Sequence, residues 1–286
     1  MQADFCNLRG RVALVTGGGA GIGRAIVEAY AALGARIVVA EIDAARLADV
    51  GQWLATHGKQ NGVEHWAMRA DVCDDEQVAA LTAGIEQRYG ALDVLVNNVG
   101  DFLLNIKPFE QTVPADWDAL YSINLRHVFG VTRAAIPLLR RAASGASIIN
   151  ISTIEAFRGI PCCAVYSAFK SAITGFTKSL ALELGPAGIR VNAIAPETTE
   201  TEQVKPSLFI QPQYREHIPR WIPLGRFGLP SDVAGCAVFL ATDLSAWVTG
   251  TTLHVDGGAL AAGGFYRTPQ GQWTNVPVVS DNGIAF

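Results

Sequence analysis

Short runs of β-branched and aliphatic residues alternate along this chain with longer segments of helical periodicity, and this alternation constrains the fold more than any other feature. Six runs read as buried strands; they span residues 11–16, 36–40, 92–96, 147–151, 189–194 and 251–255. Residues 65–70 form a weaker seventh. Apolar strands that are separated by helices form parallel sheets with both faces covered. The pattern therefore predicts an α/β protein with a doubly wound parallel sheet of about seven strands and helices on both faces.

The chain is predicted to be one domain over residues 1–286, because no repeat, charge block or low-complexity linker precedes about residue 195. The pattern breaks at about 198–228, where four prolines lie among aromatic residues. This segment is predicted to be a variable lid. The tail at about 261–286 has no periodicity either. Its aromatic side chains favour an arm that docks on the protein, and disorder is the alternative.

Charge and composition argue against several partners. The formal charge is −4, with 22 basic and 26 acidic residues scattered along the chain, whereas a nucleic acid requires a basic face. No apolar run is long enough to predict a membrane span, and no targeting pattern precedes the first strand, so a cytoplasmic location is expected. The five cysteines and five histidines show no ligand spacing. Neither a metal site nor a disulfide framework is expected.

A glycine-rich turn, TGGGAGIG at residues 16–23, follows the first strand and opens an amphipathic helix. Glycines let the backbone turn tightly and approach a diphosphate, whose charge the free N–H groups and positive end of the helix stabilise. Gly17, Gly21, Ile22 and Gly23 are therefore candidate contacts to a dinucleotide. The spacing differs from the common G-x-G-x-x-G pattern, so a tight connection without a ligand is the alternative.

Glu41 ends the second strand, eighteen residues beyond Gly23. A carboxylate there can accept hydrogen bonds from the ribose hydroxyls of NAD, and it would repel the 2′-phosphate of NADP. No lysine or arginine lies inside the glycine turn to neutralise such a phosphate, so the sequence favours NAD. The alternative is that Glu41 is a carboxylate in a solvated turn, with Asp43 as the rival candidate for the ribose contact. A further alternative is that the protein is an NADP-dependent reductase.

Polar or turn-forming residues also follow the third and fourth strands. Asp71 and Val72 come after the third, and Asn98 and Gly100 come after the fourth. Because ligands of open parallel sheets bind at the carboxyl ends of the strands, these four residues are predicted to contribute to the same dinucleotide site.

Tyr166 and Lys170 are four residues apart on a predicted helix, which places them one turn apart on one face. A phenol with a pKa of about 10 is a poor base, but a nearby ammonium and a cationic nicotinamide favour its phenolate. Tyr166 could then exchange a proton with a substrate oxygen while a hydride moves. A Tyr/Lys pair at this spacing is often a surface coincidence, and that reading is the alternative.

Together these motifs resemble the short-chain dehydrogenase/reductase family, whose fold is Rossmann-like. The resemblance covers roughly residues 8–260. It is carried by TGGGAGIG at 16–23, Asp71, NNVG at 97–100, Asn124, the hydroxyl residues after the fifth strand, YSAFK at 166–170 and DGG at 256–258. It implies that Tyr166 is the acid/base, that Lys170 lowers its pKa and binds the nicotinamide ribose, and that Asn124 holds a water connecting Lys170 to solvent.

Two positions depart from the family pattern. The usual serine, thirteen residues before the tyrosine, is Thr153 here, and Ser152 is the rival. Thr153 is preferred, with Ser152 structural. Pro196-Glu197 stands where Pro-Gly is usual, before a loop in which the resemblance gives Thr199 and Thr201 contacts to the nicotinamide. The Glu197 side chain points either into the substrate pocket or into solvent.

The expected activity is oxidation of a secondary alcohol, or reduction of its ketone, by a homotetramer. Family pocket segments nominate Asp101, Glu155, Phe157 and Trp221 as substrate contacts. Aromatic walls favour an uncharged cyclic or bulky alcohol, and the carboxylates favour a sugar or cyclic cis-diol as the alternative. A dinucleotide-sensing protein without catalysis is the alternative from a different class.

Overall fold

The computed structural model describes residues 5–206, 210 and 212–274. Its centre is a seven-stranded sheet, ordered β3-β2-β1-β4-β5-β6-β7, in which every neighbouring pair is parallel. The strands are β1 (Val12–Thr16), β2 (Arg36–Glu41), β3 (Trp66–Arg69), β4 (Val94–Asn97), β5 (Ala146–Ile151), β6 (Ile189–Pro196) and β7 (Thr252–Val255). The predicted doubly wound, Rossmann-like fold is confirmed.

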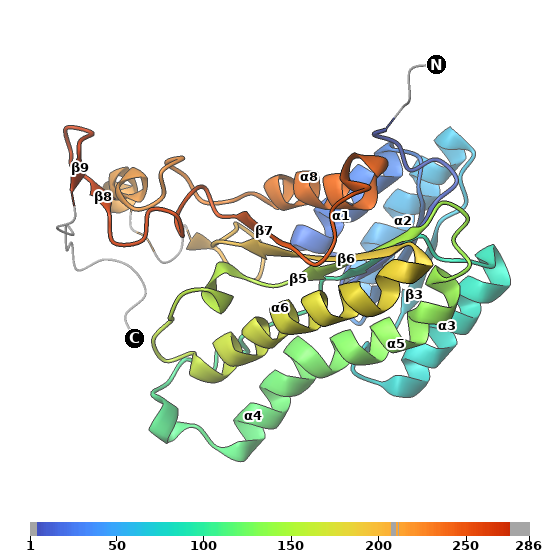
Figure 1. The fold of residues 1–286 in the computed structure, drawn as a ribbon, viewed down its shortest axis with the longest axis horizontal. Helices are drawn as coiled ribbons and strands as arrows, with labels where there is room; N and C mark the ends of the chain where they lie inside the picture. The colour runs from blue at the N-terminus through green and yellow to red at the C-terminus, as the bar shows by residue number, and fades with distance from the viewer. Residues whose placement is uncertain (1–4, 207–209, 211, 275–286) are drawn as a thin grey trace.

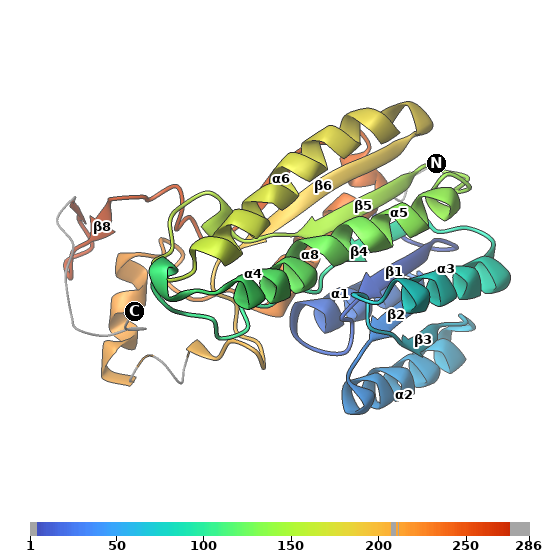
Figure 2. The ribbon, with the colours of Figure 1, turned by 90° about the horizontal axis from the view of Figure 1, so that it is seen from below.

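Helices cover both faces of the sheet (Figures 1 and 2). One face is covered by α1 (Gly21–Ala32), α2 (Ala44–Asn61) and α8 (Pro230–Ala241), whose buried residues share one hydrophobic core. The other face carries α3 (Asp75–Tyr89), α5 (His127–Leu139) and α6 (Ala164–Leu184), and α4 (Pro114–Tyr121) precedes α5. Ala13 and Val15 of β1 enter the first core, and Val12 and Leu14 enter the second. A strand buried on both faces reads as a continuous apolar run.

Several predicted boundaries were wrong by a few residues. The fourth strand begins two residues later than predicted, because Leu92 and Asp93 instead bond to Leu138 and Val12 through their backbone N–H groups. The sixth extends to Pro196, since its pairing with β7 continues to Val255. Helix α6 begins at Ala164. Tyr166 therefore lies in the first turn of this helix.

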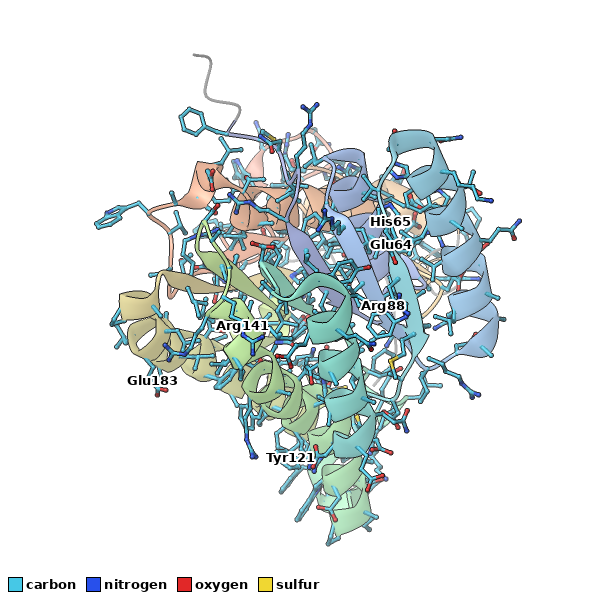
Figure 3. The ribbon with its side chains drawn as sticks, turned by 90° about the vertical axis from the view of Figure 1, so that its right-hand side faces the viewer. Glu64, His65, Arg88, Tyr121, Arg141 and Glu183 are labelled. Atoms are coloured by element: carbon cyan, nitrogen blue, oxygen red, sulfur yellow. The ribbon has the colours of Figure 1, made fainter. Side chains whose placement is uncertain are left out.

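The strand order reverses between β1 and β4, and the loops at their carboxyl ends separate there. A doubly wound sheet binds its ligand at this point. The opposite end of the molecule consists of helix ends and surface ion pairs (Figure 3). There Arg88 lies 4.9 Å above the Trp66 ring and 3.5 Å from Glu64.

The segment predicted as a lid is irregular and is anchored to the body of the protein. It includes the 3-10 helix η5 (Pro212–Arg220). Its Ile222 and Phe227 pack in a small core with Ile154 and Ala195. The end of the sheet and the lid are thus held together by apolar contacts close to the loop that follows β5.

The tail contains one feature that its sequence did not indicate. Strands β8 (Tyr266–Arg267) and β9 (Trp273–Thr274) form a short antiparallel hairpin beside the lid (Figures 1 and 2). Residues 275–286 of the predicted arm lie outside the described residues. Among the described residues, no helix is both long enough and apolar enough to cross a bilayer.

Candidate active site

Asn98, which directly follows β4, stabilises the glycine turn through hydrogen bonds. Its Nδ2 donates to the carbonyl oxygens of Thr16 (3.0 Å) and Gly17 (3.2 Å), and its backbone N–H donates to Thr16 Oγ1 (3.0 Å). A Cβ atom on Gly23 would overlap the Gly17 carbonyl oxygen and lie 2.6 Å from Asn98 Nδ2. The predicted residues Gly17, Gly23 and Asn98 are therefore brought together, and the turn requires glycine at position 23.

The start of α1 is left open to an anion. Ala20 precedes this helix and gives no side-chain cap, and its first turn holds no acidic residue. In contrast, Asp43 caps α2 and Asp74 caps α3. Uncapped N–H groups and a positive helix end favour a phosphate. The α1 terminus thus fits the diphosphate of a dinucleotide, while Ile22 packs against the core beneath it.

Glu41 lies beside this turn and is 5 % exposed. Its carboxylate accepts from the backbone N–H groups of Gly19 (3.0 Å) and Asp43 (3.1 Å). The alternative of a solvated carboxylate is therefore wrong. Asp43 is no rival, because its own carboxylate caps α2 through Ala45 and Arg46. Of the residues at the next strand end, Asp71 accepts from the Cys73 N–H (2.8 Å), and Val72 is buried in the core.

Tyr166 and Lys170 meet at the carboxyl edge of the sheet. The Lys170 Nζ lies 5.9 Å from the centre of the Tyr166 ring and donates to the carbonyl of Ile151 at 3.2 Å. Lys170 is 3 % exposed, so the alternative of a surface coincidence is wrong. A Cβ on Gly100 would lie 2.5 Å from this Nζ. The absence of a side chain at Gly100 makes room for the ammonium.

The titration of the pair differs from the expectation. Burial raises the pKa of Tyr166, and Glu155, Asp101 and Cys163 raise it further. Burial lowers the pKa of Lys170 to about 8, an effect that Asp101 partly offsets. In the protein without cofactor, desolvation and the nearby carboxylates therefore oppose the predicted acidic phenol. The phenol is held in its protonated form.

Asn124 fixes the loop that follows β4. It is fully buried within a π-helical turn, Ser122–Arg126, an irregularity often found at functional sites. Its amide donates to the carbonyl of Asp101 (2.7 Å), and its Oδ1 accepts from the Asp101 N–H (3.1 Å). His127, which the sequence gave no reason to select, is buried one turn later. Desolvation and Lys170 lower its pKa to about 4, so its imidazole is neutral.

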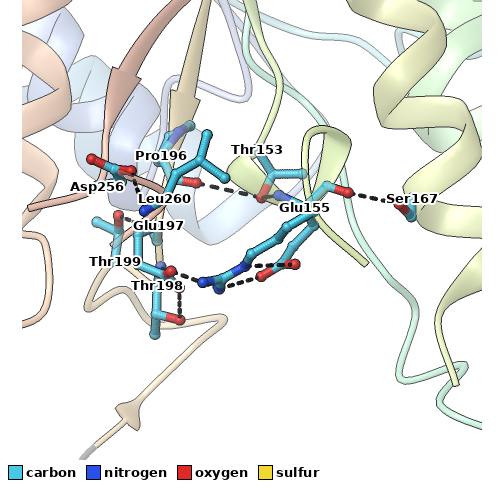
Figure 4. Close-up of polar contacts among 10 residues, drawn as sticks. Thr153, Glu155, Ser167, Pro196, Glu197, Thr198, Thr199, Asp256 and Leu260 are labelled. Carbon is cyan, nitrogen blue, oxygen red and sulfur yellow. Dashed lines mark hydrogen bonds and ion pairs between the residues drawn. The ribbon is translucent and has the colours of Figure 1, made fainter. Parts of the chain in front are cut away.

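The two candidate hydroxyls after β5 have different surroundings. Ser152 is buried, and its Oγ donates to the carbonyl of Lys170 (3.0 Å), which joins β5 to α6. Thr153 is less buried. Its Oγ1 accepts from the Glu155 N–H (3.3 Å) and donates a longer hydrogen bond to the Pro196 carbonyl (3.4 Å; Figure 4). Ser152 is thus committed to a structural bond, while the Thr153 hydroxyl lies between two loops of the site.

The threonines of the lid have separate contacts. Thr199 donates to the Glu197 carbonyl at 2.8 Å, and Thr201 accepts from the Val204 N–H at 3.0 Å. The Thr201 side chain lies 3.3 Å from the position that a Cβ on Gly21 would take. The segment predicted as a lid therefore approaches the glycine turn at Gly21. A cavity of about 520 Å³ between α1 and the lid is lined by Gly21, Arg24, Ala25, Glu28, Glu200, Thr201, Glu202, Lys205 and Pro230.

The predicted substrate contacts fall into two groups. Asp101 and Glu155 act electrostatically on Tyr166, so both lie close to the phenol. Phe157 instead packs edge-on against His254 of β7, with ring centres 4.5 Å apart. Trp221 packs against Phe227 of the lid core at 5.7 Å. The contacts that hold Phe157 and Trp221 are thus with β7 and with the lid.

Glu197 does not point into solvent, which was one of its two predicted orientations. Its side chain is 4 % exposed, and its Oε2 pairs with Arg158 at 2.6 Å. Arg158 is a site residue that sequence reasoning missed. Its spacing to Glu155 suggests a local ion pair, but Glu197 lies 39 positions away. Only the fold brings all three side chains together.

Comparisons with known proteins show the family to which the chain belongs. A family model described as enoyl-(acyl carrier protein) reductase matches residues 17–259. The 3-oxoacyl-(acyl-carrier-protein) reductase of Thermotoga maritima is 37 % identical over 254 residues, which cover 88 % of this chain and 98 % of that protein. The corresponding reductase of Synechocystis sp. is 40 % identical, and the match covers 88 % of this chain and 97 % of that protein.

Solved structures are similar over the same range. A 7α-hydroxysteroid dehydrogenase in complex with NADH and 7-oxo glycochenodeoxycholic acid is 30 % identical, with a TM-score of 0.81, covering 90 % of this chain and 97 % of the other. A short-chain type dehydrogenase/reductase from Mycobacterium marinum is 28 % identical, with a TM-score of 0.79, and the match covers 90 % of this chain and 98 % of the other. The chain belongs to the short-chain dehydrogenase/reductase family of oxidoreductases, which bind a nicotinamide dinucleotide.

Proposed function

We propose that this protein is an NAD(H)-dependent oxidoreductase that interconverts a secondary alcohol and its ketone. The observation that carries this proposal is the placement of Tyr166 and Lys170 at the carboxyl edge of the sheet, the same edge at which the uncapped α1 begins. A protein that only senses a dinucleotide needs the glycine turn but not a buried ammonium beside a phenol.

The nicotinamide, when bound, supplies or accepts the hydride. During ketone reduction the Tyr166 phenol donates its proton to the substrate oxygen, and the Thr153 hydroxyl donates a hydrogen bond to the same oxygen. The Lys170 ammonium stabilises the resulting phenolate. In alcohol oxidation Tyr166 accepts the proton, and Asn124 holds a water through which Lys170 exchanges protons with solvent. The raised pKa of Tyr166 keeps the proton that ketone reduction requires on the phenol.

The proposed cofactor preference rests on Glu41, whose carboxylate lies against the glycine turn. The Glu41→Gln variant keeps an acceptor for the Gly19 N–H and removes the charge. We expect NADH to bind wild-type protein more tightly than NADPH. In the variant that ratio should fall about tenfold, which corresponds to about 1.4 kcal/mol. Fluorescence titration with both cofactors measures the ratio.

The Asp43→Asn variant is the matched control, because asparagine caps a helix as well as aspartate. It removes a charge two residues away and should leave the cofactor ratio unchanged. Equal affinity of the wild-type protein for NADH and NADPH, or a Glu41→Gln ratio equal to that of wild type, would mean that Glu41 does not select the cofactor.

We propose an uncharged cyclic or bulky substrate. Asp101 and Glu155 place two carboxylates close to Tyr166, Glu197 shares Arg158 with Glu155, and this one guanidinium neutralises only part of the charge. An anionic group close to the reacting carbon would be repelled. The hydroxysteroid dehydrogenase relative supports a fused-ring alcohol. A sugar or cyclic cis-diol is the second candidate, and the 3-oxoacyl reductase relatives favour a 3-oxoacyl thioester as a third.

Absorbance of NADH at 340 nm, recorded with these classes of alcohol and ketone, separates the candidates. Turnover of cyclic alcohols above the other classes is the expected result. Tight NADH binding with no turnover of any compound would favour the alternative function of a dinucleotide-sensing protein without catalysis. A homotetramer, the common assembly in this family, and a cytoplasmic location remain proposals.

A further inference from the structure

Three charged side chains form a compact unit next to Thr153. The guanidinium of Arg158 makes a two-point contact with Glu155, through Nη2 to Oε1 at 2.8 Å and through Nε to Oε2 at 3.2 Å. The same Nη2 lies 2.6 Å from Glu197 Oε2. The other Glu197 oxygen accepts from the N–H and the hydroxyl of Thr198, both at 2.8 Å. These contacts surround Glu155 and Glu197 in Figure 4.

This unit joins two loops that come from neighbouring strands. Glu155 lies in the 3-10 turn Ile154–Ala156 that follows β5, whereas Glu197 directly follows β6. The Thr153 hydroxyl lies between the loops, 3.3 Å from the Glu155 nitrogen and 3.4 Å from the Pro196 oxygen. Ser167 of α6 donates to the Glu155 carbonyl at 2.7 Å. Arg158 therefore acts on the spacing between the Thr153 hydroxyl, the end of β6 and the helix that carries Tyr166.

Burial makes the guanidinium necessary for this arrangement. The side chains of Glu197 and Glu155 are 4 % and 15 % exposed, and that of Arg158 is 33 % exposed. Removing one partner from a buried ion pair leaves an uncompensated charge, which is strongly unfavourable. Without Arg158, two carboxylates would face each other across the loops. The loops would then separate, and the Thr153 hydroxyl would move with them.

We propose that Arg158 is a positioning residue for the reaction, because its guanidinium holds Glu155 and Glu197 together and thereby fixes the Thr153 hydroxyl relative to Tyr166. This inference rests on the proposed function and adds a residue to its machinery. A lysine cannot reproduce the two-point contact, since its ammonium is a single point of charge. The position therefore requires both the charge and the planar shape of arginine.

Arg158 is linked to the electrostatic surroundings of Tyr166 through its ion pair with Glu155. The charged and titratable groups that act on the phenol are Glu155 of the 3-10 turn, Asp101 of the loop after β4, and Cys163 and Lys170 of its own helix segment. Glu155 raises the pKa of Tyr166, and it does so while paired with Arg158. Loss of the guanidinium leaves the Glu155 charge unopposed, so the phenol becomes harder to ionise.

The experiment compares Arg158→Met, which removes the charge, with Arg158→Lys, which keeps it. Arg158→Met is expected to lower kcat about 10- to 100-fold, as displacement of a catalytic group by about 1 Å does, with KM for NADH changed less than threefold. With NAD bound, the midpoint of the Tyr166 absorbance titration, taken as the difference from Tyr166→Phe, should move up by about one pH unit. Arg158→Lys should lose kcat and keep the wild-type midpoint.

Arg141→Met is the matched control, because its exposed ion pair with Glu86 lies at the opposite end of the molecule (Figure 3). It should leave kcat and the midpoint unchanged. If Arg158→Met does not fold, Glu197→Gln gives the same test of kcat, since it removes one arm of the unit. Wild-type kcat and midpoint in the Arg158 or Glu197 variants would overturn the proposal. The proposal would also be overturned if Arg158→Met and Arg158→Lys lost kcat equally and the midpoint of Arg158→Met did not move. That result would indicate a merely structural role.

The two proposals fail in different ways. The Tyr166 titration needs only bound cofactor, so it reports on Arg158 even if no substrate turns over. An inactive wild-type protein whose titration responds to Arg158→Met would refute the proposed function alone.

Discussion

Replacing Tyr166 by phenylalanine is expected to lower kcat/KM about 10²- to 10⁴-fold, the usual contribution of a positioned acid or base. The variant keeps the ring that lies beside Lys170 and removes only the hydroxyl that carries the proton. Binding of NADH should change little, because the glycine turn and Glu41 are untouched. Initial rates measured in both directions, together with a cofactor titration, give the two values.

Tyr121→Phe is the control for this prediction. Tyr121 ends α4, is 37 % exposed and packs against Phe169, with ring centres 5.6 Å apart. Removal of its hydroxyl should leave kcat/KM within about twofold of wild type. A Tyr166→Phe protein as active as Tyr121→Phe would exclude Tyr166 as the proton donor, whatever the cofactor affinity.

Lys170→Met is expected to lose about 10²- to 10⁴-fold in kcat/KM and, in the protein without cofactor, to unfold at a higher temperature. The pKa of Lys170 is lowered from 10.5 to about 8, so the folded state holds its proton less tightly than the unfolded chain. At pH 7 this difference costs the wild type about 3 kcal/mol, at 1.36 kcal/mol per pH unit. The lost bond to the Ile151 carbonyl offsets about 1 kcal/mol of the gain.

The pH dependence of this gain has a fixed sign. Between pH 8 and 10.5 the unfolded wild-type chain binds more protons than the folded one, so wild-type stability rises with pH in this window. The advantage of Lys170→Met should therefore be largest below pH 8 and should disappear toward pH 10.5. Urea unfolding at pH 7 and at pH 10 measures it. A variant less stable than wild type at pH 7 would show that the buried ammonium stabilises the fold.

The architecture was predictable because it depends on local pattern. All seven strands of the central sheet were predicted, since strands such as β1 and β5 are apolar on both faces. Glu41 and the Tyr166/Lys170 pair were also found, because a strand end and a helical spacing of four place them without knowledge of distant contacts. The three-dimensional structure then added what they touch.

The features that sequence reasoning missed depend on contacts between distant segments. The partner of Glu197 is Arg158, which comes from a different loop. The pKa of Tyr166 depends on its burial and on Asp101 and Glu155, which the fold brings close from two other strand ends. The spacing of Tyr166 to Lys170 contains no information on this burial or on these two carboxylates. In the protein without cofactor these effects oppose the more acidic phenol that the spacing predicts.

Transfer of deuterium tests the central claim most directly. The alcohol that turns over fastest, labelled with deuterium on its carbinol carbon, is incubated with NAD and the wild-type protein, and the NADH is analysed by mass spectrometry. We predict one deuterium in each NADH formed, because the hydride passes directly from that carbon to the nicotinamide. Ketone formed without deuterium in the NADH would contradict direct hydride transfer, and with it the role assigned to this site.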